Sequence, residues 1–410
     1  MRTRGVSTRP LAVILSHTLV LMAALAAPVG AQTFQDSFNG ALTNTTGVGA
    51  NNCSRLGGPA GTGGPFGPQL GAICNPAFIN GATTSSGSLS VDARGQGEQE
   101  LLLRRLRERQ AGTAASADAP GGLRGLGVFA TAAYQTFDKD VTRFEPGYSR
   151  DTWGGTIGAD YFLFGGKGLI GVAFGYFHQD GAFDSKGGNF DTDAYGPTFY
   201  GSILVYPNLF VDLYAGYTRR DYTINRRYSF AMNGGPQIPS AIAHGDTHGD
   251  EAKLGVNTGY DFHFGSLTVG PRFGLNWKEN HIHSYSETGG IGLELAYDDQ
   301  HQTSFTSNLG AFASMAFSTG IGVFVPQATW EWVHEFLNDQ RVTYFHFVQD
   351  LGQRRFRFQN DPPDRDYFNA SLGLTLVLPN GLAPFVNVSQ FFGYNNQSST
   401  TVTAGLRFSF

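Results

Sequence analysis

Four residues in one short stretch have the types and spacing of metal ligands. In "HGDTHGDE", His244, Asp246, His248 and Asp250 occupy every second position. Imidazoles and carboxylates at this spacing could hold a divalent ion, which in a hydrolase would activate a water molecule. The intervening glycines make the stretch flexible, so a fixed metal geometry would be costly. We therefore expect a solvated polar loop here and no metal centre.

Two other groups of polar residues carry weaker chemical signals. His281 and His283 are two positions apart, so a strand would place both on one face, where they could bind a metal ion weakly. The run 219 to 227, "RRDYTINRR", has four arginines that could meet phosphate groups. For the two histidines we favour an ordinary polar position at the barrel rim over a metal site, whereas rim solvation and phosphate binding explain the arginines about equally well. The sequence shows no nucleophile beside a base and an orienting acid and no glycine-rich phosphate loop, so we expect neither an enzyme nor a cofactor.

The start of the chain has the pattern of a secretory signal. Arginines among the first nine residues precede an apolar run from 11 to 27 and then small residues, which predicts a signal peptide over residues 1 to 31, cut between Ala31 and Gln32. No later run of about 18 apolar residues could form a membrane-spanning helix. The two cysteines, Cys53 and Cys74, would enter an oxidising compartment, where they could form one disulfide or remain as two thiols.

The next regions are poor in regular pattern. Residues 32 to 96 are rich in Gly, Pro, Asn, Ser and Thr, which predicts loop rather than a packed core. Within 97 to 120, the stretch 98 to 111, "EQELLLRRLRERQA", has good helix formers, with acids early and arginines late, and predicts a short helix followed by a linker. The net charge of −5 does not favour nucleic-acid binding.

From residue 121 to residue 410, short segments alternate apolar and polar residues. In "KLGVNTGYDF", Leu254, Val256 and Tyr260 oppose Lys253 and Asp261, as expected for strands with one apolar face. There are 56 Gly and 34 Phe residues but only 15% charged residues, which is unusual for a helical enzyme. We identify twelve segments, centred near residues 130, 158, 173, 199, 214, 257, 273, 310, 327, 373, 387 and 405.

The connections between these segments alternate in length. The short turns "FGGKG", "YPN", "FGS", "STG" and "PNG" occupy every second gap, and most other gaps are longer and polar, such as 224 to 250 and 337 to 364. Bacterial outer-membrane barrels have short periplasmic turns and longer extracellular loops, whereas a soluble sandwich need not sort its connections in this way. The fold predicted is an all-β membrane protein, a twelve-stranded antiparallel transmembrane β-barrel.

The last residues fit the closing strand of such a barrel. In "TVTAGLRFSF", Leu406, Phe408 and Phe410 share one face, and Gly405 and Arg407 lie on the other. Hydrocarbon offers no hydrogen-bond partners, so the last strand must pair with the first.

Longer stretches resemble a known family. "LTVGPRFGLNWKENHIHSYSETGGIGLELAYDDQHQTSFTSNLG", "VFVPQATWEWVHEF" and the terminal "AGLRFSF" resemble, in this order, the translocator domain of autotransporters, over roughly residues 124 to 410. The resemblance implies type V secretion, in which the barrel carries an N-terminal passenger through the outer membrane with help from the barrel-assembly machinery and periplasmic chaperones. It also implies that Gly405, Leu406, Phe408 and Phe410 form a terminal signal for assembly.

The width of a twelve-stranded barrel suits a single helix. Eight strands leave no channel and sixteen leave an open one, so twelve should admit a helix about 10 to 12 Å wide. We expect the helix 98 to 111 to lie in the lumen, although an exposed helix would also explain its charges. Its arginines would face acids of the barrel wall; the arginines are Arg104, Arg105, Arg107 and Arg109, and the acids are Asp160, Asp212, Asp261, Glu331 and Glu335.

The sequence thus predicts an outer-membrane barrel that translocates or displays its own short N-terminal segment, in contact with membrane lipid and lipopolysaccharide and not with nucleic acid. A porin-like channel, a surface adhesin and, less favoured, an outer-membrane hydrolase remain alternatives. Residues 32 to 96 are too few for the long β-helical passenger of well-known autotransporters. The helix 98 to 111 has no Asn, so the self-cleavage by Asn cyclisation known in this family is not expected.

Overall fold

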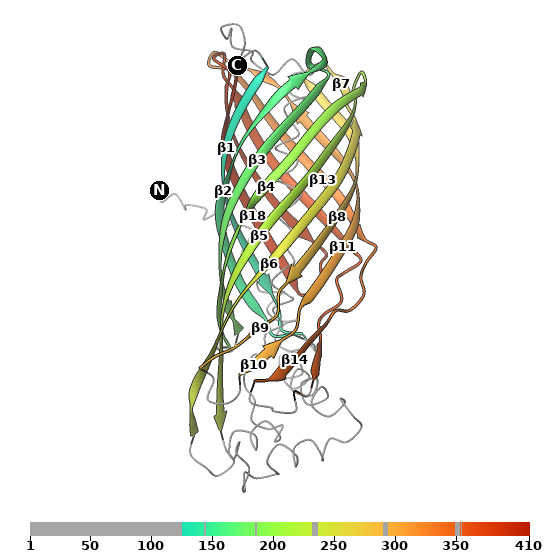
Figure 1. Ribbon diagram of the computed structural model, residues 1–410. Helices are drawn as coiled ribbons and strands as arrows, with labels where there is room; N and C mark the ends of the chain where they lie inside the picture. Colours follow the sequence, from blue (N-terminus) through green and yellow to red (C-terminus); the bar gives the residue numbers. More distant parts are fainter. Residues whose placement is uncertain are drawn as a thin grey trace, which may run out of the picture.

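Twelve long antiparallel strands form a closed barrel in the computed structural model (Figure 1). The structure describes residues 125 to 410 except 143–144, 185–186, 232–236, 290–293, 349–352 and 354. The signal peptide, the Cys53 and Cys74 pair, and the helix 98 to 111 lie outside the described residues. The barrel strands are β1 Leu126–Lys139, β2 Tyr148–Leu163, β3 Gly168–Phe183, β4 Gly188–Tyr206, β5 Leu209–Ala231, β6 Gln237–Tyr260, β8 Leu267–Ile282, β11 Gln300–Met315, β13 Val323–Glu335, β16 Asp366–Val377, β17 Leu382–Phe392 and β18 Gln397–Ser409.

Pairing between the last strand and the first closes the sheet. β18 pairs with β1 from Gly127↔Ser409 to Lys139↔Gln397, and every other barrel strand pairs with its neighbours in the chain. All twelve centres predicted from the sequence lie inside these strands, so the predicted fold is confirmed. Among the described residues, no helix is long and apolar enough to cross a membrane.

Short turns lie at one end of the barrel and long connections at the other. The short-turn end holds the 3-10 turn η2 Phe164–Gly166 and two short strands, β7 Phe262–Phe264 and β12 Phe317–Ser318. The C-terminus lies at this end, which is uppermost in Figure 1. The long connections at the opposite end contribute a small separate sheet with the order β15 (Phe356–Gln359), β14 (Val342–Phe347), β10 (Leu295–Tyr297) and β9 (Tyr285–Ser286).

Two connections that the sequence analysis treated as loops contain regular strands. β5 continues to Ala231 and β6 begins at Gln237. Most of residues 224 to 250 therefore form a long hairpin that projects beyond the barrel (Figure 1). The loop prediction was wrong because buried residues continue the inward alternation here; Tyr222, Ile224 and Ala243 are almost fully buried. Likewise β14 and β15 lie within 337 to 364.

The outer face of the barrel carries an apolar band. On β8 the outward residues from Leu267 to Trp277 are apolar over eleven positions, the length of a tilted membrane-spanning strand of about 9–11 residues. Large exposed side chains on other strands extend this band, for example Ile157, Phe199 and Leu372, at 65%, 61% and 68% exposure. A row of aromatic residues marks its edge toward the long loops: Tyr134, Trp153, Tyr176, Tyr195, Tyr217, Trp330, Trp332, Phe368 and Phe392.

Glycines on the inner face allow aromatic rings to lie flat against the wall. A Cβ on Gly171 would lie 2.3 Å from the Tyr200 ring, and one on Gly255 would lie 2.3 Å from the Tyr214 ring. No side chain fits at such distances, so only Gly permits these contacts. The two tyrosines join Phe129, Leu169 and Ala173 in a cluster of buried residues.

Candidate functional site

The lumen near the short turns is lined by acids held by groups of the wall itself. Asp261 accepts a hydrogen bond from Arg272 Nη2 at 2.5 Å, and Asp212 accepts one from Ser202 Oγ at 2.5 Å. Asp160 accepts from the Tyr200 hydroxyl at 2.9 Å. All three carboxylates are almost fully buried, a position that is tolerated only when the charge has hydrogen-bond or ionic partners.

Two arginines complete this part of the wall. The Arg407 guanidinium lies 3.5 Å from Asp160 and over the Phe129 ring, at 5.1 Å from its centroid. Arg272 lies between the rings of Phe210 and Phe312, at 4.9 and 4.7 Å from their centroids. The wall therefore alternates fixed charges of both signs with aromatic faces.

The acids predicted on β13 also point inward. Glu335 accepts hydrogen bonds from Ser304 Oγ at 2.5 Å and from the backbone N–H of Phe305 at 2.9 Å, and Glu331 accepts from Asn308 Nδ2 at 3.4 Å. The five acids thus lie on the lumen side of the wall, on β2, on β5, directly after β6 and, for two of them, on β13. Their expected partners, the arginines of 98 to 111, lie outside the described residues.

A hydrophobic core fills the mouth of the barrel at the long-loop end. Aromatic and aliphatic side chains from the strand ends pack against residues of the small sheet β15–β14–β10–β9, which we call the cap. The Tyr297 ring lies 4.9 Å from Tyr285 and 6.0 Å from Phe345. The cluster comprises Phe137, Tyr148, Phe183, Phe190, Tyr222, Ile224, Ala243, Ile282, Tyr285, Leu295, Tyr297, Phe345, Phe347, Phe356 and Phe391.

Buried ion pairs fasten the cap to the strands. Arg226 on β5 binds Glu287 through both carboxylate oxygens, at 2.8 and 2.5 Å, and both side chains are almost completely buried. Glu287 also accepts a hydrogen bond from the Leu295 backbone N–H at 2.9 Å. The run "RRDYTINRR" is therefore not one basic surface, because Arg220 and Arg226 point inward whereas Arg219 pairs with Asp221 on the outer face.

A second ion pair joins another cap loop to β1. Lys139 Nζ lies 3.2 Å from Glu145 and 2.5 Å from Asp361. Burial and the neighbouring Glu145 carboxylate raise the pKa of Asp361, while Lys139 opposes that change. Between this loop region and the barrel rim lies a cavity of about 90 Å³, lined by residues that include Phe137, Tyr394 and Gln397.

Outside the barrel, carboxylates stand immediately beyond the aromatic row. The hydroxyls of Tyr134 and Tyr176 donate hydrogen bonds to Asp151 and Asp193, at 3.0 and 2.7 Å. Asp193 also bonds His178, at 2.9 Å, and this contact raises the pKa of the imidazole. The aromatic row therefore ends in a belt of Asp and His residues at the boundary of the apolar band.

The four residues of "HGDTHGDE" lie on the outward face of β6 rather than in a loop. His244 bonds Asp246 at 3.0 Å, but Asp250 makes its contact with His283, at 3.1 Å. The Tyr217 hydroxyl also bonds Asp250 and is the main cause of the lowered pKa of that carboxyl. The structure thus separates the four residues and brings Asp250 to the His281 and His283 pair of β8 instead.

The terminal strand forms the closing seam. Leu406 is 53% exposed on the outer face, whereas Arg407 is buried in the lumen. A Cβ on Gly405 would lie 2.6 Å from the Phe385 ring. Phe408 and Phe410 contact each other edge to face, with ring centroids 4.7 Å apart, and the Phe410 backbone N–H donates to Leu126 O at 3.0 Å.

A closed barrel with an apolar outer band and a charged, hydrogen-bonded lumen has the architecture of an outer-membrane β-barrel. The family model of the autotransporter beta-domain matches residues 128–389, and the chain belongs to this family. Among solved structures, the translocator domain of autotransporter NalP from Neisseria meningitidis is similar, with 16% identity and a TM-score of 0.55 over 75% of this chain and 94% of that one.

Another solved structure gives a weaker match. The beta domain of the Bordetella autotransporter BrkA has 15% identity and a TM-score of 0.49 over 70% of this chain and 100% of that one. A search of curated proteins found no match. The family model and the similarity to the NalP translocator domain confirm the family resemblance noted in the sequence.

Proposed function

We propose that the barrel translocates its own N-terminal segment, residues 32 to 96, through the outer membrane and displays it at the cell surface. In this proposal residues 1 to 31 direct export and are removed after Ala31, residues 97 to 120 occupy the lumen, and residues 121 to 410 form the barrel. The barrel has no catalytic role and needs no cofactor.

The observation that carries the proposal is where the N-terminal segment joins the barrel. The Gly125 backbone N–H donates to Phe410 O at 3.2 Å, so the chain enters β1 beside the C-terminus, at the short-turn end. In outer-membrane barrels this end faces the periplasm. A segment attached here can reach the cell surface only by running through the lumen.

The connecting residues are long enough for that path. As a helix, residues 98 to 111 would span about 21 Å, and residues 112 to 124 could extend a further ~43 Å. A tilted strand of the length of β1 rises by only about 35 Å. The lumenal acids Asp160, Asp212, Asp261, Glu331 and Glu335 would attract the arginines of the helix.

The cap favours this function over a porin-like channel. An open channel needs a water-filled outer mouth, whereas the mouth here holds the hydrophobic cluster around Tyr297 and Phe345. We propose that, once the segment has passed, the cap closes around the chain that connects it to the lumen. Barrel-assembly machinery and periplasmic chaperones would act before this state, with Gly405, Leu406, Phe408 and Phe410 as the terminal signal, and lipopolysaccharide would surround the finished barrel.

A protease site inserted in residues 32 to 96 tests the display. On intact cells we expect cleavage at that site, and no cleavage at the same site inserted in the short turn at Asn380. Protection of the N-terminal site until the outer membrane is permeabilised would refute display.

Conductance of the purified barrel tests the lumenal segment. In a barrel whose cap is loosened by Glu287→Gln, deleting residues 98 to 111 should raise the single-channel conductance further, because a rod of matching width would leave the lumen. Unchanged conductance would contradict the lumenal position of the helix.

A further inference from the structure

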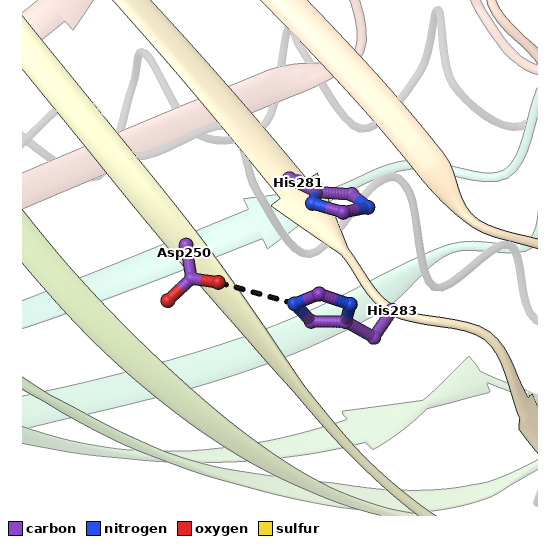
Figure 2. A group of neighbouring side chains, drawn as sticks. All are labelled: Asp250, His281 and His283. Carbon is purple, nitrogen blue, oxygen red and sulfur yellow. Dashed lines mark hydrogen bonds and ion pairs between the residues drawn. The ribbon is translucent and has the colours of Figure 1, made fainter.

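We propose that the outer face of the barrel binds a divalent transition-metal ion of the zinc class through Asp250, His281 and His283. One ligand atom from each residue can be chosen so that all of these atoms lie within 4.8 Å of one another. Figure 2 shows the Asp250 carboxylate facing His281, at the end of the neighbouring strand, and His283, just after that strand. The proposal is independent of passenger translocation.

The backbone register builds this arrangement. Asp250 on β6 is directly opposite His281 on β8, and His281 is directly opposite His301 on β11. The His283 backbone N–H donates to His248 O at 2.9 Å, so these two residues are also neighbours across the strands. Side chains two positions apart share a face, which places the whole group on the outside of the barrel.

The imidazoles form a continuous row. The ring centroids of His248 and His283 are 4.3 Å apart, those of His283 and His281 are 4.3 Å apart, and those of His281 and His301 are 4.1 Å apart. This row gathers several imidazole nitrogens, the ligand atoms that zinc-class ions favour, on one patch of the wall. His248 and His301 flank the three ligands, one at each end of the row.

The state of His281 points independently to a ligand. Its Nε2 atom is shielded from solvent and has no hydrogen-bond partner among the described residues; the nearest acid, Asp299, is 3.7 Å away. A polar atom in this condition is destabilising unless something binds it. By contrast, His178 forms a similar group with Asp180 and Asp191, and both of its ring nitrogens already have carboxylate partners, Asp193 and Asp180.

The ligand types select the metal. Two imidazoles and one carboxylate are a common ligand set for zinc, whereas magnesium and calcium prefer oxygen ligands. Nitrogen ligands of a tetrahedral zinc ion lie roughly 3.3 Å apart. The ligand atoms here lie within 4.8 Å of one another, so rotation of the side chains alone can bring them to that distance. Asp250 and His283 are already in contact, at 3.1 Å, and the ion would replace that hydrogen bond.

The position of the site suggests its effect. His283 is the first residue after β8, at the base of the loop that supplies β9 and β10 to the cap. Trp277 ends the apolar band four positions before His281, so the site lies just outside the membrane and open to ions in the medium. A bound ion would link β6 to β8 where the cap loop begins.

Zinc titration of the folded barrel tests the site. The full chain, without a polyhistidine tag and with Cys53→Ser and Cys74→Ser, is titrated with Zn²⁺ against a chromophoric chelator, and with Co²⁺ for its absorption bands. We expect one tight equivalent of Zn²⁺ per barrel. His281→Gln and His283→Gln should each weaken this binding at least tenfold, and the matched control His178→Gln should leave it unchanged.

Each variant is first checked for folding by its heat-dependent shift on gels, and X-ray absorption of the zinc-loaded wild-type barrel gives a readout that needs no variant. We expect at least two imidazole nitrogens around the ion. Failure of the wild type to bind Zn²⁺, unchanged affinity in the His281→Gln/His283→Gln double variant, or equal loss in His178→Gln would overturn the proposal.

Discussion

Changing Glu287→Gln should release the cap locally while the barrel stays folded. The substitution removes the charge that Arg226 faces but keeps the shape of the side chain. Arg226 is left as a buried guanidinium, which cannot lose its proton near neutral pH. The loop that carries β9 and β10 should therefore detach more often from the β5 and β6 hairpin.

The burial of the pair sets the size of the effect. The two side chains are 6% and 1% exposed, and they are joined by two short hydrogen bonds. Breaking a buried pair by removing one partner costs about 3–5 kcal/mol, which would raise the open population of the cap roughly a hundredfold to several thousandfold. The Arg219 side chain, by contrast, is 36% exposed and lies 3.5 Å from Asp221. Because exposed ion pairs contribute little, Arg219→Gln should lower the stability by no more than about 1 kcal/mol.

Native-state hydrogen exchange measures this opening. The Thr288 backbone N–H donates to His244 O on β6 at 2.8 Å, so its protection reports whether the cap loop is closed onto the hairpin. We expect its protection to fall at least a hundredfold in Glu287→Gln and less than tenfold in Arg219→Gln, while amides in the middle of β1 stay protected. Replacing both partners, as Arg226→Met with Glu287→Leu, should restore most of the protection because no buried charge remains. Equal protection in Glu287→Gln and in Arg219→Gln would refute the reasoning.

Three further predictions concern other parts of the barrel. Burial raises the pKa of Tyr394 to about 12, so the stability that it contributes is complete below pH 10 and is lost as the pH rises through 12; Tyr394→Phe should remove this alkaline loss from the melting temperature. Phe408→Ser should lower the amount of barrel that reaches the outer membrane, whereas Phe317→Ser, which removes an exposed aromatic residue from a short turn, should not; equal losses would contradict a terminal signal. Epitope tags within residues 337 to 364, at the long-loop end, should be labelled on intact cells and tags at Asn380 should not, and the reverse pattern would show that the orientation is wrong.

The strands could be predicted because their signals are local. Alternation of apolar and polar residues follows from the geometry of one extended segment, and turns such as "PNG" mark its ends. Both signals lie within about a dozen residues, so all twelve strands were found without knowledge of their partners. The even number of strands and the alternating lengths of their connections then indicated closure into a barrel.

The same local signals failed at the long-loop end. The extension of β5 and β6 has His and Asp residues on its outer face and glycines on its inner face, as in "HGDTHGDE", and this composition is also typical of loops. Its inward residues Tyr222 and Ile224 are buried by cap segments far away in the sequence. For the same reason the arginines of "RRDYTINRR" looked alike, although the partner of Arg226, Glu287, is 61 positions away.

The sequence alone determined the number of strands, the face of each strand that meets lipid, and the inward direction of Asp160, Asp212 and Asp261, because each of these depends on position within a single strand. Only the tertiary structure decided which residues become neighbours across strands. It placed Asp250 beside His281 and His283, paired Arg226 with Glu287, and closed the mouth with four short cap strands. These contacts depend on the register between strands and on the packing of distant loops. Neither produces a repeating pattern of apolar and polar residues in the sequence.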